Sequence, residues 1–109
     1  MPRYLILASY NETGKQALAS QPQDRVAGVR RLMEELGGTL ESFDFSMGEH
    51  DVVAVCELPD DVAAVTLSLS VQKAGHLKSF STTRLLSSEE MMRAMEQASG
   101  IQYQPPHRA

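Results

Sequence analysis

The stretch FDFSMGEHDVVAVCEL (residues 43–58) decides how this chain folds. Its first part alternates, placing Phe43, Phe45 and Met47 on one face and serine or aspartate on the other, which is typical of a strand with one dry face. Its second part, VVAVCEL, is apolar on both parities and predicts a strand inside a sheet. Gly48 provides the turn between the two parts, so the stretch predicts a β-hairpin.

Upstream of this hairpin, RYLILASY (residues 3–10) is also apolar on both parities, so we expect a second interior strand. Thr13 followed by Gln16 has the form of a capping box and predicts a short helix. We expect a second helical segment from Pro22, because residues 23–36 carry one apolar stripe that ends at two glycines.

Downstream, Asp60 is a plausible N-cap for the run VAAVTLSLSVQKAG. Part of this run alternates like a strand, yet it lies between a cap and Gly75, so we interpret it as a helix. Residues 76–86 predict a strand rich in serine and threonine. Ser87 and Glu90 form a second capping box, which predicts a last helix.

The order of these elements is β-α-β-β-α-β, followed by an added C-terminal helix. It predicts an α+β, ferredoxin-like fold with a four-stranded antiparallel sheet in the order 4-1-3-2. We place one domain over residues 1–98 and a tail over residues 99–109, either disordered or docked on a partner.

Both helices of this repeat lie on one face of the sheet, while the two interior strands are apolar on both faces. An open apolar face requires a cover. We expect a homodimer or higher oligomer, packed sheet to sheet, because a two-fold axis makes one patch complement itself. The alternative is a monomer whose third helix covers the face.

Composition excludes several classes of protein. The chain has 109 residues, one cysteine and a net charge of −4 without a basic block, so neither an internal disulfide nor nucleic-acid binding is expected. The apolar run near the N-terminus is too short for a secretory signal or a bilayer span. We therefore expect a cytoplasmic protein without a membrane partner.

The predicted topology brings distant polar residues to one edge of the sheet. The candidate ligand-binding residues are Tyr10, Asn11, His50, Asp51 and His76. His50 and Asp51 could be an acid/base pair or metal ligands. Neighbours on a strand point to opposite faces, however, so the two could not easily hold one ion. Turn chemistry, with Asp51 accepting from nearby backbone N–H groups, explains the same residue types. We expect no metal and no cofactor.

Other polar and sulfur-containing residues have structural interpretations. Cys56 is expected to be a buried, inert thiol. Met91, Met92 and Met95 have helical spacing and are expected to fill the core or a dimer contact. One further polar set lines a pocket or the inter-subunit space if it points away from the helices, and is an exposed edge if it does not: Ser42, Asp44, Ser46, Ser79 and Ser81.

Four segments carry a resemblance to a known family: RYLILASY, LGGTLESFDFSMGEHDVV, ELPDD and STTRLLSSEE. Through them the chain resembles the GYD domain family, which is similar to the dimeric α+β barrels and largely unassigned in function. The family pattern is Gly-x-Tyr-Asp. Here Gly48, His50 and Asp51 stand at those positions, so a histidine replaces the tyrosine. Related barrels include small monooxygenases, haem-handling enzymes and ligand-sensing domains.

Three functions remain open at this point. The first is an oligomeric domain that binds a small molecule at the sheet edge or the subunit interface. The second is a cofactor-free monooxygenase or related enzyme for an aromatic substrate, with His50 or His76 as proton acceptor. An apolar pocket with a histidine opening into it would favour the enzyme, and a packed interior would remove it. The third is a structural subunit whose tail pairs with a neighbour.

Overall fold

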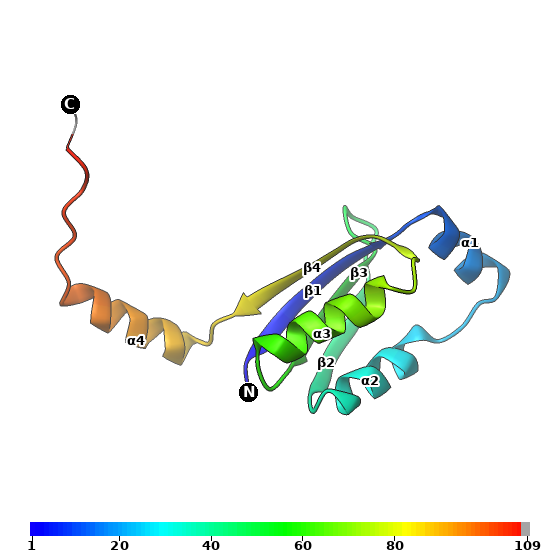
Figure 1. The fold of residues 1–109 in the computed structure, drawn as a ribbon, viewed down its shortest axis with the longest axis horizontal. Helices are drawn as coiled ribbons and strands as arrows, with labels where there is room; N and C mark the ends of the chain where they lie inside the picture. The colour runs from blue at the N-terminus through cyan, green and yellow to red at the C-terminus, as the bar shows by residue number, and fades with distance from the viewer. Residues whose placement is uncertain (108–109) are drawn as a thin grey trace.

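The computed structural model describes residues 1–107 of the chain (Figure 1). The elements, in chain order, are β1 (Arg3–Tyr10), α1 (Glu12–Ser20), α2 (Arg25–Glu35), β2 (Thr39–Phe45), β3 (Val52–Glu57), α3 (Asp61–Gln72), β4 (Leu77–Leu85) and α4 (Ser88–Ser99). The strands form one antiparallel sheet in the order β2-β3-β1-β4. This arrangement confirms the predicted ferredoxin-like α+β fold with an added C-terminal helix.

Helices cover one face of the sheet. Tyr4, Ile6 and Cys56 point toward this side and are buried, where Met33 of α2 and Leu67 of α3 pack over them. Cys56 is fully buried, and burial, with a smaller effect of the Glu41 charge, raises the pKa of its thiol to about 11. The thiol therefore stays protonated at neutral pH, and the expectation of a buried, inert cysteine is confirmed.

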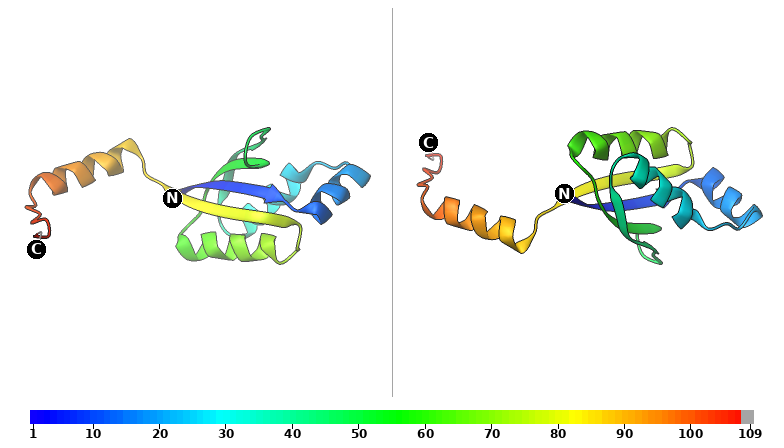
Figure 2. Two further views of the ribbon diagram at one scale, coloured as in Figure 1. Left: turned by 90° about the horizontal axis from the view of Figure 1, so that it is seen from above. Right: turned by 90° about the horizontal axis from the view of Figure 1, so that it is seen from below.

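The opposite face of the sheet has no helix over it in residues 1–107. Figure 2 shows α3 along one side of β1 and β4, with the other side open. Leu5 and Leu7 of β1 lie beside Val55 and Val53 of β3 on this side, and all four are only partly buried. We call these four residues the open apolar face.

Two helix starts differ from the sequence prediction. The side chain of Asn11, and not that of Thr13, caps α1 by accepting from the Gly14 N–H at 2.8 Å. Because Asn11 is the N-cap, α1 begins at Glu12 and Thr13 lies inside its first turn. α2 begins at Arg25 behind an Asp24 cap, later than Pro22. The predicted caps of α3 and α4, Asp60 and the Ser87–Glu90 box, are confirmed.

The dry face predicted for β2 is wrong beyond its first aromatic residue. Phe43 is partly buried, but Phe45 is 61% exposed and Met47 is fully exposed. The strand ends at Phe45, and β2 lies at an edge of the sheet. The end of this hairpin therefore extends past the helices, and residues 1–107 leave its apolar side chains Phe45 and Met47 exposed.

The helix α4 projects away from the sheet (Figure 1). None of its residues is buried, and Met91, Met92 and Met95 are each about half exposed, so they do not belong to the core. The projection gives a radius of gyration of 18.1 Å, against about 13 Å for a compact chain of this length.

Residues 101–107 of the predicted tail are exposed, and residues 108–109 lie outside the described residues. No helix within residues 1–107 is long and apolar enough to cross a membrane.

Tyr4 links the sheet to α3, and its ionisation makes the free energy of unfolding fall at alkaline pH. Its hydroxyl donates to the Asp61 carboxylate at 2.6 Å. Burial first, and then this hydrogen bond and the Asp61 charge, raise the pKa of Tyr4 to about 12, whereas an unfolded tyrosine titrates near about 10. The folded state keeps the proton that the unfolded state loses, so this contribution is complete below about pH 10 and disappears toward about pH 12.

We expect Tyr4→Phe to lower the free energy of unfolding by about 1 kcal/mol at pH 8, because one hydrogen bond is lost. The difference from the wild type should narrow as the pH rises above 10. Urea unfolding at several pH values measures both effects, with Tyr103→Phe in the exposed tail as the matched control. A difference that stays constant with pH would show that the raised pKa is not a property of the folded state.

Candidate functional site

A cavity of about 330 Å³ lies between the helix-covered face of the sheet and α1, α2 and α3. The centre of its floor is formed by two small residues of the interior strands. Ala54 of β3 lies between Ile6 and Phe43, and Ala8 of β1 lies between Val52 and Phe80 in the next row. Larger side chains at these two positions would fill the space, so the pair of alanines creates the hollow.

The three helices form the remaining walls. Met33 and Val29 of α2, Leu67 and Val71 of α3, and Ala17 of α1 line the space. These residues follow helical spacing within α2 and α3, so one stripe of each helix meets the cavity. The result is a site with a predominantly apolar lining, which is the usual surface of a small-molecule pocket.

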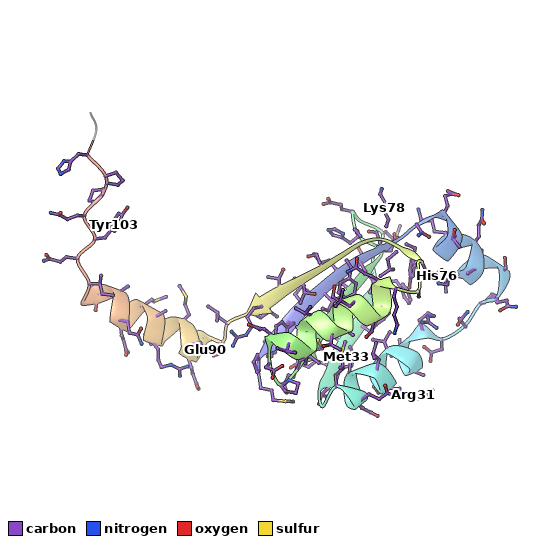
Figure 3. The ribbon with its side chains drawn as sticks, viewed as in Figure 1. Arg31, Met33, His76, Lys78, Glu90 and Tyr103 are labelled. Carbon is purple, nitrogen blue, oxygen red and sulfur yellow. The ribbon has the colours of Figure 1, made fainter. Side chains whose placement is uncertain are left out.

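Four polar side chains line the cavity: Tyr10 at the end of β1, His76 just before β4, and Gln23 and Arg25 at the start of α2. His76 lies between the end of α3 and α1 (Figure 3). The Arg25 guanidinium donates to the Gln23 side-chain oxygen at 3.1 Å. A largely apolar cavity with a few grouped polar residues is suited to hold an apolar molecule that carries one polar group.

Tyr10 is a hydrogen-bond donor at neutral pH. Burial raises the pKa of its phenol, the Arg25 charge opposes this by lowering the pKa, and the Asp51 charge raises it slightly. The net shift is upward, so the phenol keeps its proton well beyond pH 7.

The backbone at this edge of the sheet is held by Asn11 and Asp51. Asn11 donates from its backbone N–H to the His76 carbonyl at 3.0 Å and from its side chain to the Gly75 carbonyl at 2.8 Å. The Asp51 carboxylate accepts from the Tyr10 N–H at 2.9 Å. Both side chains thus position the cavity-lining Tyr10 and His76, and neither lines the cavity itself.

His50 lies near this edge but does not line the cavity. It is partly buried, and its Nδ1 atom is buried without a hydrogen-bond partner among the described residues. Of the five residues proposed from sequence, the structure brings Tyr10 and His76 to the cavity. Within residues 1–107, no three acidic, histidine or cysteine side chains are grouped as a metal would require.

Sequence reasoning missed Ala8, Ala54, Gln23 and Arg25. A signal for the first two was available, because both are small residues at inward positions of strands whose other inward residues are larger. Gln23 and Arg25 gave no such signal. They belong to a helix start whose position relative to the sheet depends on the long connection through α1.

Gly14 allows α1 to approach His76 closely. A Cβ atom at this position would collide with the His76 backbone carbonyl, whereas a Cβ atom at Gly28 of α2 meets nothing closer than 4.0 Å. We expect Gly14→Ala to lower the free energy of unfolding by about 1–3 kcal/mol, as overpacking does. Gly28→Ala should raise it by about 0.5–1 kcal/mol, because alanine favours a helix interior. Urea unfolding measures both free energies of unfolding. If Gly14→Ala were as stable as Gly28→Ala, the close contact between α1 and His76 would be refuted.

Fold and site together define a single-sheet ferredoxin-like α+β domain with an apolar cavity under its helices. The chain belongs to the GYD domain family, whose family model matches residues 4–95. This match includes every strand of the sheet except the first residue of β1, and it includes every residue that lines the cavity. No curated protein matches the sequence.

Proposed function

We propose that this GYD domain protein binds a small molecule in the cavity between the sheet and its helices. The observation that carries the proposal is the volume of about 330 Å³ with a mostly apolar lining. Ligand pockets usually measure about 300–1,000 Å³.

Titration calorimetry with 2-naphthylmethanol, a neutral probe with two fused rings, tests this proposal. We expect saturable binding of one molecule per subunit. The heat-capacity change should be negative, because apolar surface is buried. Absence of saturable binding up to the solubility of the probe would contradict the proposal.

The second candidate is a cofactor-free monooxygenase-like enzyme that acts on an aromatic substrate in the same cavity. The observation that favours it is that His76, whose imidazole belongs to the side chains used for general acid–base catalysis, lines the apolar space together with Tyr10. Oxygen uptake with a dihydroxynaphthalene that disappears in His76→Ala would favour the enzyme. Binding of the same compound without oxygen uptake would favour the binding domain.

We further propose that a second copy of the chain covers the open apolar face. Leu5, Leu7, Val53 and Val55 gather at its centre, and serine and aspartate flank them on the two edge strands: Ser42, Asp44, Ser79 and Ser81. An apolar centre with a polar rim is the usual composition of a protein interface.

The methionines of α4 also belong to this proposed interface. Four strands about 4.8 Å apart and about 20 Å long present only about 400 Å² of face, whereas a stable interface takes about 800 Å² from each partner. Met91, Met92 and Met95 form an apolar stripe on a helix that contacts no core. A helix of this length is marginal when isolated in water. Packing of α4 against the second copy would supply the missing area.

A further inference from the structure

We propose that the natural ligand of the cavity is an acid: a flat apolar body of about two fused rings that carries one carboxylate, with Arg25 as the residue that selects the carboxylate. This inference rests on the proposed function and adds the chemical class of the ligand. It follows from the size of the apolar space and from the charge on one part of its wall.

The apolar space sets the size of the body. An engineered cavity of about 150 Å³ takes up benzene, and this cavity measures about 330 Å³. The volume therefore suits roughly two aromatic rings. The floor on the sheet, with Ile6, Ala54 and Phe80, and the facing Leu67 of α3 carry side chains without polar atoms, so a polar group of the ligand would lose its hydrogen bonds there.

The charge of Arg25 sets the chemistry of the other end. Arg25 is the first residue of α2 and lines the cavity. The ion pairs within residues 1–107 are Arg3–Glu41 and Arg84–Glu90, and the hydrogen bond of Arg25 goes to the neutral amide of Gln23. Its neighbour Asp24 caps α2 by accepting from the Val26 N–H at 2.9 Å. Among the residues that the structure describes, no carboxylate forms an ion pair with the Arg25 guanidinium.

A carboxylate matches this arrangement better than other polar groups. A guanidinium binds the two oxygens of a carboxylate through two parallel hydrogen bonds. Tyr10, which also lines the cavity and keeps its phenol proton, adds a neutral donor on the same side. Within residues 1–107 no carboxylate lines the cavity, so this part of the chain places no acidic group against an acidic ligand. An amine would meet the Arg25 charge and be repelled.

Two matched probes separate the acid from its neutral analogue. 2-Naphthoate and 2-naphthylmethanol share the two-ring body and differ at one substituent. We expect the wild-type protein to bind 2-naphthoate roughly tenfold more tightly, as measured by titration calorimetry in 150 mM salt. Arg25→Gln should reduce this ratio to about one while the affinity for the alcohol stays unchanged.

Arg30→Gln is the matched control, because Arg30 lies on the same helix, is exposed and does not line the cavity. It removes the same charge and should keep the tenfold ratio. Equal ratios in the two variants, or equal binding of the two probes by the wild type, would overturn the selection of acids but leave the cavity site intact. Failure of both probes to bind would overturn the proposed function and this inference together.

Discussion

Ala54→Leu is expected to lower the affinity for 2-naphthylmethanol roughly fiftyfold. Ala54 lies at the centre of the cavity floor, between Ile6 and Phe43, and is 2% exposed. Leucine adds three carbon atoms where the rings of the probe would lie. Each displaced methylene equivalent corresponds to about 0.8 kcal/mol of lost burial, and about 1.4 kcal/mol corresponds to a factor of ten. Titration calorimetry of wild type and variant gives the ratio.

The same substitution should leave the protein folded, because the new side chain fills an existing space. Cavity filling commonly raises the free energy of unfolding by about 0.5–2 kcal/mol, which urea unfolding measures. Ala27→Leu makes the identical chemical change on the exposed side of α2 and should not alter binding. If Ala54→Leu proved unstable, Ala8→Val would place a smaller obstacle in the next row of the floor. Wild-type affinity in a folded Ala54→Leu protein would exclude the cavity as the site.

Leu7→Asp is expected to convert the proposed dimer into a folded monomer. Leu7 lies at the centre of the open apolar face, beside Val53 and Ser81, and points away from the helices. In a sheet-to-sheet dimer its aspartate would be buried without a cationic partner, which costs several kcal/mol. The dimer dissociation constant should therefore rise by a factor of at least about 100. Sedimentation velocity measures this as a change from twice the subunit mass to the single-subunit mass of 12.0 kDa.

Val65→Asp provides the control on the other side of the molecule. Val65 lies on the outer side of α3 and is 57% exposed, so the same change there should leave the dimer intact. Dissociation by Val65→Asp together with tolerance of Leu7→Asp would place the interface on α3. A wild-type protein that sediments as a monomer at high concentration would exclude the second copy altogether.

Much of the fold could be predicted because local signals and periodicity agreed. The strands β1 and β3 are apolar on both parities, and this pattern placed them in the interior of the sheet. The run after Asp60 alternated in part like a strand, yet its cap and Gly75 predicted the helix that the structure contains. In each of these cases neighbouring residues carry the information.

The remaining features depend on contacts between segments distant in sequence. The alternation predicted Phe45 as a core residue, but its burial depends on whether a helix reaches the end of the hairpin, and no helix in the described part of the chain does. Arg25 reaches the cavity because the connection through α1 returns the chain over the sheet. The exposure of Met92 follows from the direction in which α4 leaves β4, where Glu90 accepts from the backbone N–H of the N-cap Ser87 and pairs with Arg84 at 3.3 Å. The directions in which helices leave the sheet are not encoded in the periodicity of apolar residues along the sequence.

The most direct test of the central claim is a methyl NMR titration of the full chain with 2-naphthylmethanol. Ile6, Ala8, Ala54, Leu67 and Val71 line the cavity, and their methyl signals should shift together and saturate at one probe per subunit. The methyl groups of Met91 and Met95, which lie on α4 and do not line the cavity, should not follow the same saturation. Shifts confined to methyl groups outside the cavity, or no saturable shift at the cavity residues, would contradict the claim that this cavity is a ligand site.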